Sequence, residues 1–234
     1  APLDVTVFFL SQYYNGIGQS GQVNRDFGCT KAGQMVSVVP HIYGLTAKDF
    51  MFYNLDSYKQ RYEKLPHCFQ IEDFLPQTYL LRFPDQCREF HKEWMQNQSL
   101  PPETAKKWIV KTAGKHRGQG VAMLTADSIE TFGLHSVMTG ECTYLNQRII
   151  IQEYITNPLL IRGKKFDLRV YMFVSSTKPL VVYFSPYWYA RIAVNEYDQD
   201  DFSSSTMLTN RFQARQTLEA EGNWAEKSPE LIMV

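Results

Sequence analysis

The chain has 234 residues, of which 44% are hydrophobic and 14% aromatic, a composition typical of a globular protein with a sizeable core and not of a disordered chain. Lys and Arg together number 24, as do Asp and Glu, so the zero net charge gives no bulk attraction for nucleic acid or acidic lipid. No apolar run in the sequence approaches the ~20 residues of a membrane-spanning helix. We therefore expect neither a nucleic-acid partner nor a membrane span.

The first part of the chain, residues 1–77, is expected to form an N-terminal subdomain. The apolar run over 5–10 is typical of a strand, and a second short strand is expected over 36–39. Residues 46–63 show the apolar periodicity of a helix, which places Asp49 on its exposed side.

Residues 78–147 are expected to form a central subdomain that carries a glycine-rich loop. Phe83, Cys87, Phe90 and Trp94 recur at helical spacing, which indicates core positions rather than a binding stripe. The expected elements are a strand over 69–81 broken at Pro76, a helix over 84–98, strands over 108–111 and 121–124, and a short helical turn over 127–132.

Residues 148–234 are expected to form a C-terminal subdomain built mainly of strands. Its apolar runs are rich in aromatic and β-branched residues, which favour extended structure. The expected strands cover 148–154, 166–175, 179–185 and 187–194.

The cysteines give no sign of a metal site or of a disulfide framework. Cys29, Cys68, Cys87 and Cys142 are widely and irregularly spaced, without a C-x-x-C pair. The histidines are scattered without the spacing of metal ligands. We therefore expect reduced thiols and assign no metal ligand.

Lys165, Asp167 and Arg169 alternate along one predicted strand. Side chains two residues apart share a face of a strand, so these charges point the same way. Burying three charges on one face is costly unless they meet partners or a charged ligand. The pattern therefore predicts a polyphosphate site.

The glycine-rich loop over 113–120 lies between two predicted strands. Main-chain N–H groups of Gly118 and Gly120 can approach an anion without a Cβ in the way, and Lys115 and Arg117 add positive charge. The loop lacks the G-K-[ST] ending of a Walker loop. Taken alone, this loop is explained somewhat better as an ordinary β-hairpin with a basic tip.

Other candidate residues have simple structural explanations when each is taken alone. Lys111 closes an apolar strand, where it is either a cation beside a nucleotide or a lysine that reaches solvent. The main chain of 152–155 could read an adenine edge or simply end a strand. Arg191 fits an edge strand, and Thr209 and Asn210 fit a turn.

The order and spacing of these blocks together are more specific than any one of them. Over about residues 35–212 the sequence resembles the tubulin tyrosine ligase-like family. The matching blocks are FLPQTY at 74–79, WIVK at 108–111 with RGQGV at 117–121, IIQEYI at 150–155 with NPLLI at 157–161, KFDLR at 165–169, LTN at 208–210 and, more weakly, LTAKD at 45–49.

The resemblance implies an ATP-grasp fold of the α/β (α+β) class, with mainly antiparallel sheets and a nucleotide site between the central and C-terminal subdomains. It implies ATP and Mg²⁺ as cofactors. Arg169 and Arg191 would be catalytic, stabilising phosphates and an acyl-phosphate intermediate. The residues that it assigns to the nucleotide are Lys111, Arg117, Gly118, Gly120, Gln152, Glu153, Tyr154, Ile155, Lys165, Asp167, Thr209 and Asn210.

Two departures from the family pattern affect these expectations. Met207 stands where a His commonly precedes Leu-Thr-Asn. The family's late metal-binding segment, a strand that ends Glu-x-Asn, is absent; Glu221-Gly222-Asn223 matches by letter, but no apolar strand leads into it. We therefore expect an incomplete C-terminal subdomain or a degenerate member, and the first residue, Ala1 rather than Met, favours a portion of a longer enzyme.

The resemblance implies an ATP-dependent ligase that adds an amino acid, glutamate first, to glutamate side chains of tubulin tails. Glycylation and tyrosination stay open. The expected partners are tubulin or microtubules and an amino-acid substrate, in the cytoplasm at the cytoskeleton or in a cilium. The alternatives are a non-catalytic scaffold that binds microtubules or other proteins, and an ATP-grasp ligase of small molecules.

Overall fold

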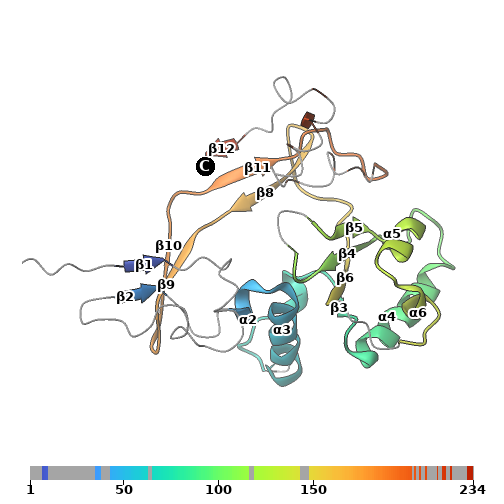
Figure 1. Cartoon of the computed structure of the whole chain (residues 1–234), viewed down its shortest axis with the longest axis horizontal. Helices are drawn as coiled ribbons and strands as arrows, with labels where there is room; N and C mark the ends of the chain where they lie inside the picture. The colour runs from blue at the N-terminus through green and yellow to red at the C-terminus, as the bar shows by residue number, and fades with distance from the viewer. Residues whose placement is uncertain are drawn as a thin grey trace, which may run out of the picture.

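The computed structural model describes residues 7–9, 35–37, 43–62, 65–115, 119–142, 148–201, 203, 206, 209, 215, 218–219, 222 and 231–233. Within these residues, helices and strands alternate as far as β6, and the elements that follow β6 are mainly strands, as Figure 1 shows. The expected fold class, a mixed α and antiparallel β architecture consistent with ATP-grasp, is confirmed.

The central sheet has the strand order β3-β6-β4-β5, and each neighbouring pair is antiparallel. Its inner strand β6 contains three consecutive isoleucines that are buried on both faces, and isoleucine fits a pleated, packed surface. The strands are β3 (Thr78–Leu80), β4 (Trp108–Thr112), β5 (Val121–Met123) and β6 (Ile149–Glu153).

Helices cover both faces of this sheet. On one face Val110 and Ile151 pack with Phe90 of α4 (Pro84–Asn97), and α5 (Ala126–Thr131) and α6 (His135–Met138) complete the layer. On the other face Leu80 and Ile150 pack with Phe52 of α3 (Lys48–Tyr62). Neighbouring residues of one strand thus enter opposite cores, as the two-residue period of a strand requires.

A second four-stranded sheet has the order β12-β11-β8-β7. Figure 1 shows the long hairpin of β9 and β10 leading away from β8 and β11, and β1 and β2 form a separate parallel pair. The strands are β7 (Leu160–Ile161), β8 (Lys164–Arg169), β9 (Met172–Thr177), β10 (Leu180–Phe184), β11 (Tyr189–Ile192), β12 (Leu231–Met233), β1 (Val7–Phe9) and β2 (Met35–Ser37).

Several predicted elements differ in detail. The stretch 69–81 is not one strand: it forms the 3₁₀ helix η1 (Ile71–Asp73) and then, after Pro76, the strand β3. The run 166–175 is two strands, β8 and β9, that pair with different partners. The helix expected over 46–63 is α3, preceded by the short helix α2 (Tyr43–Thr46). Apolar periodicity identifies runs, but pairing partners decide where each run divides.

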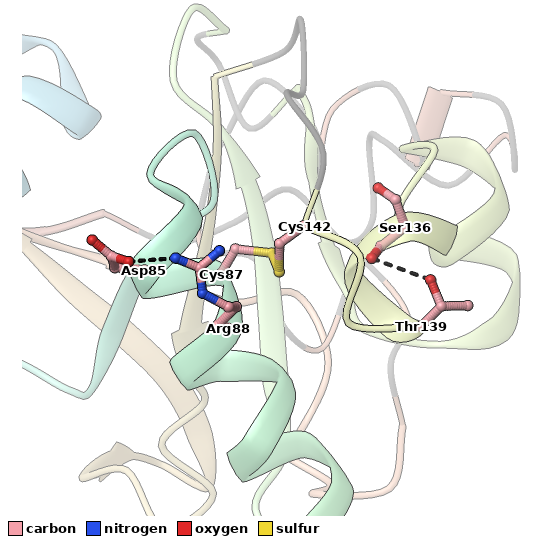
Figure 2. The surroundings of a disulfide bond; sticks show 6 residues. All are labelled: Asp85, Cys87, Arg88, Ser136, Thr139 and Cys142. Carbon is pink, nitrogen blue, oxygen red and sulfur yellow. Dashed lines mark hydrogen bonds and ion pairs between the residues drawn. A yellow bond between two sulfur atoms is a disulfide. The ribbon is translucent and has the colours of Figure 1, made fainter.

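The prediction of reduced thiols is wrong for one pair. Cys87 of α4 and Cys142, just after α6, form a buried disulfide with 5.8 Å between their Cα atoms (Figure 2). The two residues are 55 positions apart, and bridging depends on how close their Cα atoms come in space rather than on their spacing in sequence. Cys68 is a free thiol.

The three expected subdomains remain a prediction. The pairing places β6 between β3 and β4, so the central sheet includes residues beyond position 147. Among the helices in the described ranges, none has the length and apolarity that a membrane crossing requires.

Candidate functional site

Lys111 and Gln152 lie on the face of the central sheet that α3 partly covers. The Lys111 ammonium donates to the Gln152 side-chain oxygen, and the Gln152 amide donates to Thr78 Oγ at 2.8 Å. Lys111 and Gln152 therefore form a polar strip across β4, β6 and β3, beside the apolar contacts of Leu80 and Ile150.

Three lysines from separate elements converge at this strip. Burial, together with the charges of Lys48 and Lys165, lowers the pKa of Lys111 to about 8. Burial also lowers the pKa of Lys48 and of Lys165. Cations that are buried near one another disfavour their own charged forms, so this geometry suits an anionic ligand that would sit among them.

Lys165 connects β8 to the end of β6. Its ammonium donates to the Tyr154 hydroxyl at 3.1 Å and lies 4.5 Å from the centroid of the Tyr154 ring. Burial raises the pKa of Tyr154, so its hydroxyl remains protonated at neutral pH. The cation–π contact and the hydrogen bond hold the Lys165 head group beside the segment 152–155.

The main chain of the segment 152–155 is partly used within the fold. The N–H of Glu153 donates to the carbonyl of Gln77 at 2.8 Å, and the N–H of Tyr154 donates to the carbonyl of Lys107 at 2.8 Å. Ile155 follows with an exposed side chain. An adenine edge would therefore have to use groups other than these two N–H donors, and the adenine contact of this segment stays a prediction.

The alternation of Lys165, Asp167 and Arg169 is confirmed by the register of β8. In the antiparallel pair with β11, Asp167 lies opposite Arg191 and Arg169 lies opposite Tyr189, so all of these side chains share one face. Arg191 Nε donates to Asp167 Oδ1 at 2.7 Å, and a second guanidinium nitrogen donates to Oδ2. The Asp167 carboxylate raises the pKa of Arg191.

The glycine loop is the connection of the β4–β5 hairpin, as predicted. Gly120 has φ +64°, and a Cβ there would come within 3.0 Å of Thr112. The N–H of Thr112 donates to the Gly120 carbonyl at 2.7 Å, so a glycine is needed to close this hairpin. Arg117 and Gly118 lie outside the described residues, as does Asn210; Thr209 is half-buried.

Lys48 is the residue that the sequence analysis missed. It begins α3, and its ammonium donates to the carbonyls of Thr112, at 3.4 Å, and Lys115, at 3.2 Å, at the base of the glycine loop. The only sequence signal was its place in the weakly matching block 45–49. The contact spans 64 residues of sequence, so no local pattern predicts it.

The neighbouring Asp49 corrects a further expectation, because it is not on the exposed side of its helix. Its side chain is buried and 1% exposed, and its carboxylate accepts hydrogen bonds from Arg148 and Arg82. Burial alone would raise its pKa, but hydrogen bonds and charge from Arg148 lower it. Asp49 thus remains a carboxylate inside the fold.

Comparisons with known proteins identify the relatives of this chain. A profile described as "Tubulin-tyrosine ligase family" matches residues 29–223. The chain belongs to the tubulin-tyrosine ligase family. The match covers the central sheet, the glycine loop and the strands β8 and β11 that carry the clustered charges.

Similar proteins have names that concern tubulin or glycylation. The probable alpha-tubulin polyglutamylase Ttll1 of Tetrahymena thermophila is 32% identical over 213 residues, covering 83% of this chain and 50% of that protein. Mouse tubulin polyglutamylase TTLL5 is 32% identical over 179 residues, covering 76% of this chain and 11% of that protein. Mouse protein polyglycylase TTLL10 is 28% identical over 159 residues, covering 63% of this chain and 21% of that protein. The human protein, named "Inactive polyglycylase TTLL10", is 28% identical over 156 residues, covering 63% of this chain and 22% of that protein. The chain thus spans half or less of the length of these relatives.

Proposed function

We propose that this family member binds ATP at the lysine cluster and acts as an ATP-dependent ligase on tubulin tails. The amino acid added would be glutamate, with glycine as the main alternative. The names of the similar polyglutamylases and polyglycylases support the substrate class. The observation that carries the proposal is the convergence of Lys48, Lys111 and Lys165 at the polar strip.

A polyphosphate fits this arrangement for an electrostatic reason. Each of the three ammonium groups is disfavoured by burial, and each would be stabilised by a phosphate oxygen placed between them. The turn that ends at Gly120 can bring main-chain groups close to such an anion. Gln152, Glu153, Tyr154 and Ile155 would border the base, with Thr209 and Asn210 completing the site.

The two arginines would act on the reacting groups. ATP would supply the phosphoryl group that converts a glutamate carboxylate into an acyl phosphate, with release of ADP, and the amine of the incoming amino acid would then displace phosphate. Fixed cations stabilise the negative charge that spreads during both steps. Arg169 is exposed and available for this role, whereas Asp167 fixes the guanidinium plane of Arg191.

The described residues offer no ligand set for magnesium. Among the described residues, no three His, Cys, Asp or Glu side chains form a group that could hold a metal ion, and Asp167 already pairs with Arg191. Action on tubulin would place the protein in the cytoplasm at microtubules, and in cilia where these are axonemal.

A non-catalytic scaffold is the second candidate. It is favoured by Met207, which replaces the family's usual His, and by the similarity to a human protein whose name states that it is inactive. Such a protein would keep the fold and its protein contacts without turnover.

Nucleotide binding by the full-length protein separates the two candidates. We expect Mg²⁺-dependent binding of ATP, measured by calorimetry, to be lost on Lys165→Ala and Arg169→Ala and to be retained on Lys178→Ala, an exposed lysine in the β9–β10 turn. An Arg191→Lys variant should bind ATP but lose at least ~tenfold in turnover, because a lysine cannot replace the two-point contact with Asp167. Weak binding that none of these changes affects would favour the scaffold.

A further inference from the structure

We propose that Asp49 is a positioning residue that locks α3 onto the base of the glycine loop through Arg148. The idea rests on the proposed nucleotide site, because it concerns how that site is held in shape. It requires three contacts: Asp49 with Arg148, Arg148 with the loop, and Lys48 with the loop.

The first contact is a two-point ion pair in which the Asp49 carboxylate is buried and the Arg148 side chain is partly exposed. Arg148 Nε donates to Asp49 Oδ2 at 2.5 Å, and a terminal nitrogen of Arg148 donates to Oδ1. Arg82 donates to the same Oδ2 at 3.4 Å, and both guanidinium groups lie over the Phe50 ring, at 5.3 Å for Arg82 and 5.0 Å for Arg148. A pair with two parallel hydrogen bonds fixes distance and orientation together.

The second contact joins this pair to the loop. Arg148 directly precedes β6, and its main-chain carbonyl accepts the N–H of Ala113 at 2.9 Å. Ala113 is the first residue after β4, where the glycine loop begins. The same arginine therefore holds α3 with its side chain and the loop with its backbone.

The third contact is made by the residue beside Asp49. Lys48 donates to the carbonyls of Thr112 and Lys115, the two ends of the first turn of the loop, in which the N–H of Lys115 donates to the Thr112 carbonyl at 3.4 Å. Two consecutive residues of α3 thus reach the same turn, one directly and one through Arg148. With Asp49 fixed, the head group of Lys48 stays at the loop and near Lys111.

A positional role explains why a charged pair is used here. An ion pair with a buried carboxylate often adds little stability relative to well-packed apolar side chains, because the carboxylate loses its hydration. A pair with defined geometry, however, specifies one arrangement of the elements that carry it. Asp49 links α3, the turn before α4 through Arg82, and the start of β6, which are the elements around the loop.

The test measures amide hydrogen exchange in the full-length protein without nucleotide, comparing wild type with Asp49→Asn. We expect the amides of Thr112, Ala113 and Lys115 to exchange at least ~tenfold faster in the variant, while those of Val110 and Ile151 change less than ~twofold. Glu72→Gln is the matched control, because it neutralises the carboxylate of an exposed ion pair with Lys59 at the far end of α3. This control should leave the loop unchanged.

A second, more conservative variant keeps the test valid if Asp49→Asn fails to fold. Arg148→Lys keeps the charge but loses the two-point contact, so it should also release the loop amides selectively, with a higher KM for ATP and a smaller change in kcat. Unchanged loop exchange in both variants, or equal acceleration throughout the central sheet, would overturn the proposal. If the wild-type protein does not bind ATP, the proposed function fails, yet the exchange data still decide whether Asp49 positions the loop.

Discussion

The Lys111 ammonium donates to the Gln152 side chain diagonally across two antiparallel strands, because the register places Lys111 opposite Ile150 and Gln152 opposite Ile109. Diagonal neighbours of this kind share a face of a sheet and lie within reach of long side chains. The contact holds the Lys111 head group over the centre of the sheet face, where burial and two further lysines depress its pKa.

The depressed pKa of Lys111 predicts how stability depends on pH. Between about pH 8 and the ordinary lysine value, the folded ligand-free protein holds the residue neutral while the unfolded chain keeps it protonated. The unfolded state therefore binds more protons there, and the free energy of unfolding should rise with pH across that window.

Lys111→Met should accordingly stabilise the ligand-free protein at pH 7 by ~1–3 kcal/mol and remove that rise, while ATP binding is lost. Denaturant unfolding at pH 7, 8 and 9.5 measures both effects. Lys178→Met is the control and should change neither. If Lys111→Met instead lowered the free energy of unfolding at pH 7, the charged form of Lys111 would not be destabilising in the folded protein.

The disulfide predicts a dependence of stability on reducing agent. Cys87 and Cys142 close a loop of 55 residues, and chain entropy gives such a link about 4 kcal/mol. We expect Cys142→Ala, or dithiothreitol, to lower the denaturant midpoint of the protein, whereas Cys68→Ser should have a small effect because that thiol is free. In a further check, the folded protein is denatured without a reducing agent and then treated with an alkylating agent. Alkylation of both Cys87 and Cys142 would contradict the disulfide.

Gly133 and Gly140 both have a positive φ, but only at Gly140 would a Cβ also contact a neighbouring side chain. Alanine variants at the two positions therefore distinguish the cost of backbone strain from the cost of steric contact. Gly140 has φ +78°, and a Cβ there would lie 2.8 Å from ring atoms of His91; Gly133 has φ +63° with open space around it. Gly133→Ala should cost ~1–2 kcal/mol from its backbone angle alone.

Gly140→Ala should cost more, ~2–4 kcal/mol, because His91 must also move. Urea unfolding of both variants gives the difference directly. A Gly140→Ala variant that is no less stable than Gly133→Ala would mean that α4 and the end of α6 are packed less closely than the structure shows.

Local patterns were enough to place much of the secondary structure. The helical spacing of Cys87 and Phe90 predicted α4 and its buried face, and both residues are in the core. The alternation of Lys165, Asp167 and Arg169 predicted their common face, because the two-residue period is a property of any strand.

Long-range contacts were the part that local patterns could not supply. Asp49 looked exposed because helical periodicity reports on the helix alone, and its partner Arg148 is 99 residues away. Lys48 was passed over for the same reason, and the Cys87–Cys142 pair has no spacing that signals it.

The amino-acid sequence by itself indicated the family, most of the helices and strands, and which charges share a strand face, since all of these depend on residue order within short windows. The tertiary structure decided that lysines from α3, β4 and β8 meet, that Arg191 is engaged by Asp167, and that α3 is tied to the glycine loop by Asp49 and Arg148. Those outcomes depend on the register of the sheets and on the packing of α3, which bring together residues that lie far apart in the chain.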